Sequence, residues 1–284
     1  DNIRAVKPDI VYASATGFGP KGPRARLAAM DMVAQAAGGF AWANGTPDEP
    51  WPAGPTIADQ TGSLLLAYGI LAALLHRLRT GEGQQVDVSL LGSQMTLQAW
   101  SIAQFFLTGE RPRGGRDGSS SPIFTLYRAS DAWLAVAIID ERQWPVFCSI
   151  VGRPELAADP RFDGRAAREQ NRAELTRLLD NAFAAKTRSE WLAVFESADI
   201  PCGPVHDYSD LAADPQVAAN RYLREIDVPG HGPMRLVGPA VDLSRTPASC
   251  DRAAPELGQR TEEVLLELGY NWPEIAHLRE EHVI

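Results

Sequence analysis

Residues 55–84 read PTIADQTGSLLLAYGILAALLHRLRTGEGQ. Apolar residues recur over 64–75 at the three- and four-residue spacing of an α-helix, and a basic last turn followed by Gly81 is a typical helix end. Asp59 stands at the other end, where unpaired backbone N–H groups and the positive end of the helix dipole favour an ionised carboxylate. The stretch therefore predicts a long helix with Asp59 at its start.

A carboxylate at this place has two possible roles. It can cap the helix by accepting hydrogen bonds from the first free N–H groups. It can also act as a nucleophile that forms a covalent intermediate with a substrate. The residues around Asp59 alone leave both roles open.

Composition narrows the class of protein. The chain has 284 residues, enough for a large core and two domains. Hydrophobic residues make up 45% of it and charged residues 22%, which is ordinary for a globular protein. The net charge of −9 argues against a nucleic-acid partner. The longest apolar run, 64–75, is too short to cross a bilayer, so we expect no membrane segment.

The cysteines indicate the compartment. There are three, far apart in the sequence: Cys148, Cys202 and Cys250. This usage favours a reducing compartment, and with no recognisable targeting signal in the chain we expect the cytoplasm. It also argues against a disulfide framework and against a metal site. We expect Cys202 to be buried and unreactive.

The order of elements in the first part favours an α/β fold. Residues 10–14 read as a buried parallel strand and 85–90 as a second strand, with helices expected over 28–41, after Asp59, and over 92–107. Strands separated by helices are typical of an open parallel sheet with Rossmann-like topology. The chain opens partway through such a βα pattern, so we expect an N-terminal truncation with the first βαβ units missing.

The rest of the chain predicts a second, smaller domain. We assign 1–110 to the large Rossmann-like domain, 111–122 to a glycine-rich linker or loop, 123–220 to a small α+β domain, and 221–284 to a return linker and C-terminal segment. A hairpin over 123–139 is expected to open the small domain. The last helix is expected over 261–268.

Seven segments together resemble one known family. They are YASATGFG (12–19), DMVAQAAGG (31–39), IADQTG (57–62), GILAALLHR (69–77), TGEGQQVDVSL (80–90), PCGPV (201–205) and LGQRTEEVL (257–265). With them the chain resembles the family III coenzyme A transferases (CaiB/BaiF type) over essentially its whole length. The resemblance implies a large Rossmann-like domain and a small domain joined by two linkers, in ring-shaped subunits that interlock as a homodimer.

The resemblance also implies site residues and substrates. It assigns the covalent nucleophile to Asp59, and substrate or CoA contacts to Met30, Gly38, Gly39, Gly114 and Gly115, with the glycine-rich loop as the source of oxyanion donors. The substrates are then an acyl-CoA and a small carboxylic acid, with no permanently bound cofactor. Asp59 would pass through an anhydride and an aspartyl-CoA thioester.

Three alternatives stay open. An isomerase like the α-methylacyl-CoA racemases is disfavoured, because those relatives carry a histidine where this chain has Met30, and methionine cannot exchange protons. Intramolecular CoA transfer within one dicarboxylate would keep Asp59 as nucleophile. A truncated, non-catalytic dimerising fragment is the alternative of another class. Separately, Arg111, Arg113 and Arg116 either bind an anionic substrate group or form a solvated basic loop.

Overall fold

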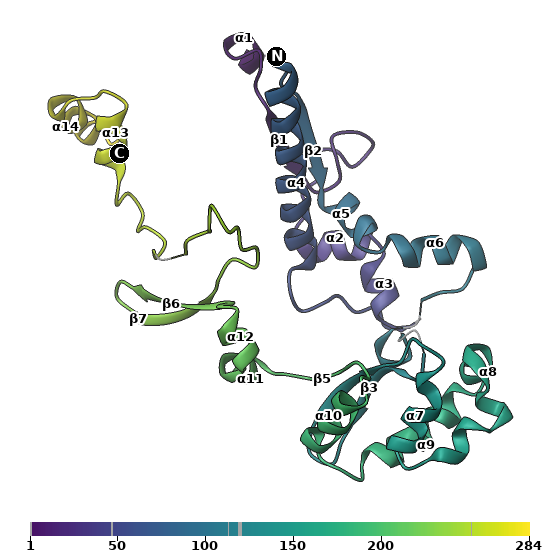
Figure 1. Cartoon of the computed structure of the whole chain (residues 1–284). Coiled ribbons are helices and arrows are strands. Elements are labelled where there is room, and N and C mark those ends of the chain that lie inside the picture. The colour runs from purple at the N-terminus through teal and green to yellow at the C-terminus, as the bar shows by residue number, and fades with distance from the viewer. Residues whose placement is uncertain (1, 47, 113, 119–120, 251) are drawn as a thin grey trace. The chain divides into compact units, whose positions relative to one another are not determined.

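The computed structural model describes residues 2–46, 48–112, 114–118, 121–250 and 252–284 (Figure 1). The chain divides into two compact units, one ending at Pro204 and the other beginning at Val205. The division into domains at 110, 122 and 220 stays a prediction.

The first part of the chain is a parallel α/β arrangement. Its elements are α1 (Asn2–Val6), β1 (Tyr12–Thr16), α2 (Asp31–Ala37), α3 (Phe40–Asn44), α4 (Ile57–Thr80), β2 (Gln85–Ser89), α5 (Leu90–Leu97) and α6 (Ala99–Thr108). Strands β1 and β2 pair in parallel, with Tyr12 opposite Gln85 and Thr16 opposite Ser89. Parallel strands need a long crossover, and here the crossover contains α2, α3 and α4. Helix α4 packs against β2 and α5 (Figure 1).

Helix α4 confirms the prediction from the sequence. It has 24 residues and ends at Gly81, which adopts the left-handed conformation (φ 78°) and donates its N–H to the carbonyl of Arg77 at 2.8 Å. One face of the helix is exposed and apolar, with Leu64, Tyr68, Leu71, Leu75 and Leu78. By length and composition alone α4 would also cross a bilayer, with a mean hydropathy of 1.4 over its most apolar window, and one such helix is weak evidence of a membrane segment.

Three details differ from the sequence-based expectation. The helix expected over 28–41 is two helices, since Gly39 takes a left-handed conformation (φ 82°) between α2 and α3. The helix expected over 92–107 breaks at Gln98, whose side-chain amide donates to the carbonyls of Gly38 and Gln94. Strand β1 is mostly exposed instead of buried, because in the described chain its sheet has two strands.

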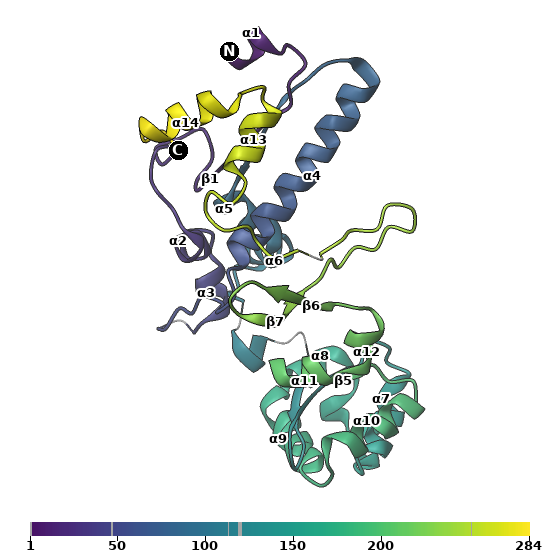
Figure 2. The ribbon, with the colours of Figure 1, turned by 90° about the vertical axis from the view of Figure 1, so that its left-hand side faces the viewer.

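The described residues between 115 and 204 build a compact α+β layer. Its elements are the short 3₁₀ helix η1 (Gly115–Gly118), β3 (Phe124–Arg128), β4 (Trp133–Ala137), α7 (Gln143–Ile150), η2 (Pro154–Ala157), η3 (Pro160–Phe162), α8 (Gly164–Gln170), α9 (Arg172–Phe183), α10 (Arg188–Ser197) and β5 (Cys202–Pro204). The antiparallel sheet has the order β3-β4-β5, and the expected hairpin is its first pair. Helices α9 and α10 pack on the sheet (Figure 2). The core between them is aromatic, with the Tyr127 and Phe183 rings stacked at 4.3 Å.

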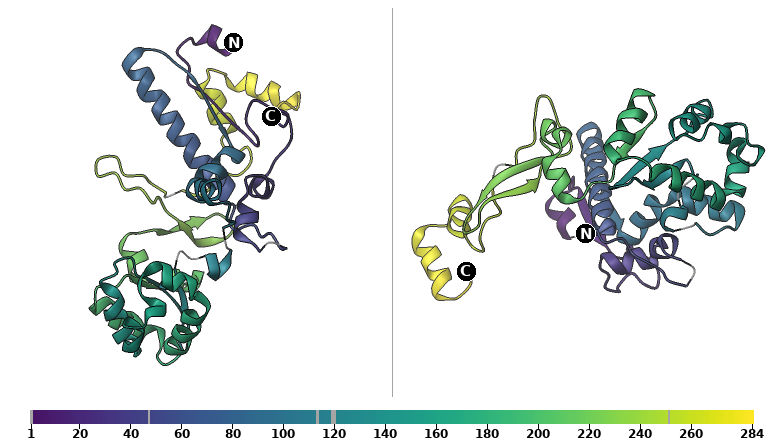
Figure 3. Two further views of the ribbon diagram at one scale, coloured as in Figure 1. Left: turned by 90° about the vertical axis from the view of Figure 1, so that its right-hand side faces the viewer. Right: turned by 90° about the horizontal axis from the view of Figure 1, so that it is seen from below.

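The second unit contains α11 (Tyr208–Ala213), α12 (Pro215–Ala219), the antiparallel hairpin β6 (Leu223–Val228) and β7 (Gly232–Val237), α13 (Thr261–Glu267) and α14 (Trp272–Glu280) (Figure 3). Helix α14 corrects the expectation that the last helix lies over 261–268. The sequence did contain its signal, because Asn271 and Glu274 form a capping box and Pro273 lies in the first turn.

Candidate active site

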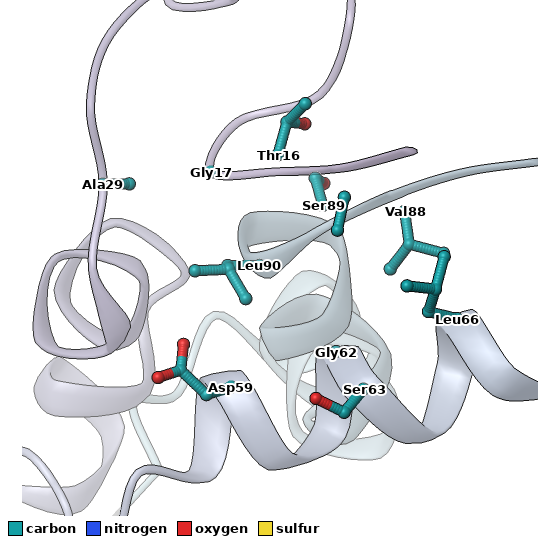
Figure 4. Close-up of a pocket in the computed structure, with 11 residues that line it drawn as sticks. Thr16, Gly17, Ala29, Asp59, Gly62, Ser63, Leu66, Val88, Ser89 and Leu90 are labelled. Atoms are coloured by element: carbon teal, nitrogen blue, oxygen red, sulfur yellow. The ribbon is translucent and has the colours of Figure 1, made fainter. Parts of the chain in front are cut away.

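A cavity of about 290 Å³ opens where β1, β2 and α4 meet (Figure 4). Two strand ends line it: residues 15–17, at the end of β1 and just beyond it, and residues 88–90, at the end of β2 and just beyond it. The rest of the lining consists of Ala29 and the α4 residues Asp59, Gly62, Ser63 and Leu66. The carboxyl ends of parallel strands are where open α/β folds bind their ligands. The cavity therefore occupies the position that this fold class uses for a site.

Asp59 is the one ionisable side chain that the described residues contribute to the lining of this cavity. It is the third residue of α4, after Ile57 and Ala58, so it lies within the positive end of the helix dipole. Its carboxylate points from the first turn of α4 toward Leu90 (Figure 4), and it makes no hydrogen bond within the described chain. A carboxylate held this way is free to meet a ligand.

The helix cap is supplied by another residue. Asp31, the first residue of α2, accepts hydrogen bonds through Oδ1 from the backbone N–H groups of Ala58 (2.7 Å) and Asp59 (3.2 Å). These are the groups that a local N-cap side chain would satisfy, and the side chain of Thr56 at that position makes no capping bond. The capping role that the sequence left open for Asp59 is thus filled by Asp31.

Gln35 completes a small buried network behind the cavity. Its side-chain amide donates to Oδ2 of Asp31 (2.6 Å), while its amide oxygen accepts from the N–H of Ala53 (2.8 Å). The side chain is almost fully buried, with 1% exposed. Helix α2 therefore holds the segment that leads into α4 at two places, Ala53 and the first turn of the helix.

The two strand ends meet closely at the cavity wall. The carbonyl of Gly17 accepts a hydrogen bond from the N–H of Leu91 at 3.0 Å, which joins the loop after β1 to the start of α5. A Cβ at Gly17 would lie 2.3 Å from the Cβ of Ala29, so a larger residue does not fit here without a shift. Ser89 caps α5 through the N–H of Gly92.

The glycine and methionine positions assigned from the resemblance lie elsewhere in the described chain. Met30 precedes α2, is 74% exposed, and is not part of the cavity lining. Gly38 is buried against α5, where a Cβ would lie 2.6 Å from the Cβ of Gln94. Gly39 forms the left-handed junction between α2 and α3. Their roles in binding substrate stay predictions.

The glycine-rich loop lies beside the end of α3. A Cβ at Gly114 would approach the carbonyl oxygens of Asn44 (2.2 Å) and Gly45 (2.4 Å), so only glycine allows this contact, and Gly115 takes a left-handed conformation (φ 61°). Neither residue lines the cavity that contains Asp59. Their assignment as oxyanion donors also stays a prediction.

The two described arginines of this loop have structural partners. Arg116 forms a two-pronged ion pair with Asp180 (2.6 and 3.1 Å) and lies over the ring of Tyr127. Burial opposes its charge, but the Asp180 carboxylate prevails and the pKa of Arg116 is raised. Arg111 donates to the carbonyl of Thr46 at 2.8 Å and lies over the Trp42 ring. Arg113, the third candidate, lies outside the described residues.

Other chemistries find little support in the described residues. They contain no group of three histidine, cysteine or acidic side chains that would hold a metal ion. Cys202 is half-buried, whereas the sequence predicted a buried side chain. Partial burial still raises the pKa of its thiol, and its Sγ lies 3.9 Å from the carbonyl oxygen of Leu192, so the reactive thiolate is disfavoured. The sequence-based interpretation did not find Asp31 and Gln35, because their role depends on residues far along the chain.

Comparison with known proteins places this geometry in a family. Residues 1–261 match the family described as CoA-transferase family III. An acyl-CoA transferase from Fusarium pseudograminearum is 33% identical over 100% of this chain and 63% of its own length, and a succinyl-CoA:glutarate CoA-transferase from Mus musculus is 34% identical over 94% of this chain and 62% of its own. The chain thus spans less than two thirds of the length of these curated relatives.

Solved structures agree with the sequence matches. A CaiB/BaiF family protein from Brucella suis superposes with a TM-score of 0.78 at 30% identity, covering 94% of this chain and 70% of that one. Rv3272 from Mycobacterium tuberculosis, in its orthorhombic form, gives a TM-score of 0.78 at 26% identity, covering 92% and 70%. The segments around β1, α2, α4 and β2 that suggested the resemblance lie within the matched range, and the chain belongs to CoA-transferase family III.

Proposed function

We propose that the protein transfers coenzyme A from an acyl-CoA to a small carboxylic acid, with Asp59 as covalent nucleophile. One observation carries the proposal: Asp59 faces a cavity at the carboxyl ends of β1 and β2, while the capping bonds of its helix are taken by Asp31. Its carboxylate is therefore free for chemistry. Membership of family III supports the same reaction class.

The proposed reaction proceeds through two exchanges at one carboxylate. An oxygen of Asp59 attacks the thioester carbonyl of the donor, the C–S bond breaks, and CoA leaves as thiolate with a mixed anhydride on the enzyme. The thiolate then attacks the Asp59 carbonyl, which releases the donor acid and leaves an aspartyl-CoA thioester. The acceptor carboxylate attacks this thioester and repeats the two steps in reverse, so that acyl-CoA leaves and Asp59 is regenerated.

The local structure suits these steps. The nucleophile must be ionised, and the dipole of a helix N-terminus stabilises a nearby carboxylate by about 0.3–1 kcal/mol. Each tetrahedral intermediate needs donors at its oxyanion, and we assign them to the backbone of Gly114 and Gly115. Met30, Gly38 and Gly39 are proposed to contact the substrate or its CoA portion.

The relatives suggest which substrates to test. Those from Mus musculus and Agrobacterium fabrum are named as transferring CoA between succinate and glutarate, so succinyl-CoA with a dicarboxylic acid acceptor is the first pair to try. The proposal includes no permanently bound cofactor and a homodimeric assembly. A cytoplasmic location belongs to it as well, and the three free cysteines support that part.

The test is intact-mass spectrometry of the full-length protein, before and after incubation with succinyl-CoA and a panel of other acyl-CoAs. The parent protein is expected to gain the mass of CoA less one water, as an aspartyl-CoA thioester requires, and Asp59→Asn is expected to gain none and to lose turnover. Asp9→Asn, which alters an exposed carboxylate paired with Lys7, is the control. A parent-level adduct on Asp59→Asn would contradict the assignment. Absence of any adduct, with exchange of the α-proton into D₂O, would favour the isomerase.

A further inference from the structure

The first turn of α4 is held from behind by a network of four hydrogen bonds. Asp31 accepts from the N–H groups of Ala58 and Asp59, and Gln35 bridges Asp31 to the N–H of Ala53. The contacts join α2 to residues 18 to 28 positions later in the chain. No other side chain is recorded as capping α4 in the described structure.

The network is placed to set the position of Asp59. One of its bonds ends on the backbone N–H of Asp59, so a shift of the Asp31 carboxylate moves the backbone that carries the nucleophile. The connection from α3 is also held at Trp51, whose N–H donates to the carbonyl of Ala41 at 3.0 Å. The segment entering α4 is therefore fastened at three successive points, and the Asp31–Gln35 pair supplies the two nearest to the nucleophile.

We propose that Asp31 and Gln35 are positioning residues for the covalent step, acting through the first turn of α4 on the orientation of the Asp59 carboxylate. The inference rests on the proposed role of Asp59 as nucleophile. Reactions between groups held in an enzyme are sensitive to small errors of placement, and a displacement of about 1 Å can lower the rate about 100-fold. Neither side chain is required to touch the substrate.

The hydrogen-bond polarity of the pair offers a sharp test. In Asp31→Asn the amide oxygen can still accept from Ala58 and Asp59, but the amide nitrogen then faces the side-chain nitrogen of Gln35, and two donors meet. In Gln35→Glu two carboxylate oxygens meet at the place of the present 2.6 Å hydrogen bond. In both single variants one bond of the network is lost.

The double variant restores the network with reversed polarity. With Asp31→Asn and Gln35→Glu together, the nitrogen at position 31 donates to the carboxylate at position 35, whose other oxygen accepts from Ala53. All four hydrogen bonds can form again, and the pair keeps one negative charge. Conservative rescue of this kind separates positioning from a simple loss of volume or charge.

The experiment measures kcat and KM of the full-length protein with succinyl-CoA and glutarate, and the rate of CoA adduct formation by mass spectrometry, below the unfolding temperature of each variant. Each single variant is expected to lose about 100-fold in kcat with a much smaller change in KM. The adduct should form correspondingly slowly. The double variant is expected to recover most of the loss.

Asp131→Asn is the matched control. Like Asp31, Asp131 accepts a hydrogen bond from a backbone N–H at the start of a helix far away in the sequence, here the N–H of Arg188 in α10 at 2.7 Å. Unlike Asp31, it lies in the α+β layer, and it is not part of the cavity lining. The kcat of the Asp131→Asn variant is expected to equal that of the parent.

If Asp59→Asn is inactive, two results would overturn the inference. One is a kcat per folded molecule in the single variants that equals that of the parent. The other is a double variant whose kcat is no higher than that of the single variants. An active Asp59→Asn would instead refute the proposed function itself.

Discussion

At the scale of single residues, Gly17 shows how closely the wall of the cavity is packed. Its φ is not in the left-handed region, so the backbone there would accept any residue. The constraint is steric, because a Cβ would lie 2.3 Å from that of Ala29, and the neighbouring chain would have to move. Both residues line the cavity, so any such movement changes its shape.

We expect Gly17→Ala to lower the free energy of unfolding by about 1–3 kcal/mol, the usual cost of overpacking, as measured by urea denaturation. Gly203→Ala is the matched control, because Gly203 has ordinary φ and no heavy atom within 4 Å of an added Cβ. The control should stay within about 0.5 kcal/mol of the parent. Equal stability of the two variants would show that the contact between Gly17 and Ala29 is looser than the structure has it.

At the scale of elements, α10 begins with a complete capping box. Thr187 Oγ1 accepts from the N–H of Glu190 (3.3 Å), and the Glu190 carboxylate accepts from the N–H of Thr187 (2.8 Å). The backbone hydrogen bond from Thr187 holds the pKa of Glu190 below its ordinary value of 4.5. The lowered pKa means that the ionised form stabilises the folded state above pH 4.5.

This gives a pH dependence with a defined sign. As pH falls below 4.5, the unfolded state takes up a proton at Glu190 before the folded state does, so the contribution is lost as pH approaches the lower folded pKa. Glu190→Gln is expected to be less stable than the parent at pH 7, and the gap should narrow on acidification. Glu196→Gln, at the other end of α10 and outside the capping box, is the control. Thermal unfolding between pH 3 and 7 measures both, and a gap independent of pH would contradict the assignment.

At the scale of the whole molecule, the large buried side chains are unevenly distributed. The aromatic core lies in the α+β layer of 115–204, with Tyr127, Phe147, Phe183, Trp191 and Phe195. In residues 2–108 the described buried side chains are small or polar, such as Ala58, Ala73 and Gln94, and the outer face of α4 is apolar and exposed. An apolar face of this extent is typical of a surface covered in the assembled protein.

The exposed apolar face of α4 supports the proposed homodimer. We expect the full-length protein to show twice its subunit mass by size-exclusion chromatography with light scattering, with no shift toward the monomer on dilution through the micromolar range. Obligate interfaces are large and apolar, so their dissociation is not expected under these conditions. A subunit-sized mass at all concentrations would refute the homodimer.

Much of the fold depends on interactions between residues that are close together in the sequence. The long helix, its stop at Gly81, and the hairpin of β3 and β4 depend on contacts between near neighbours in the chain, and they were predicted correctly. The break of the expected helix at Gln98 was not, because the amide of Gln98 bonds to Gly38, 60 residues earlier. Helix α14 was missed although its signal is local.

The sequence by itself determined that Asp59 begins the long helix, that β1 and β2 alternate with helices, and that the chain belongs with the CoA-transferases. Only the tertiary structure decided what surrounds that carboxylate. Asp31 reaches the helix start from 28 residues away and Gln35 reaches Ala53 from 18, and no periodicity or spacing encodes such contacts. They arise when α2 packs beside the start of α4, so that Asp31 makes the capping bonds and the Asp59 carboxylate is left to line the cavity.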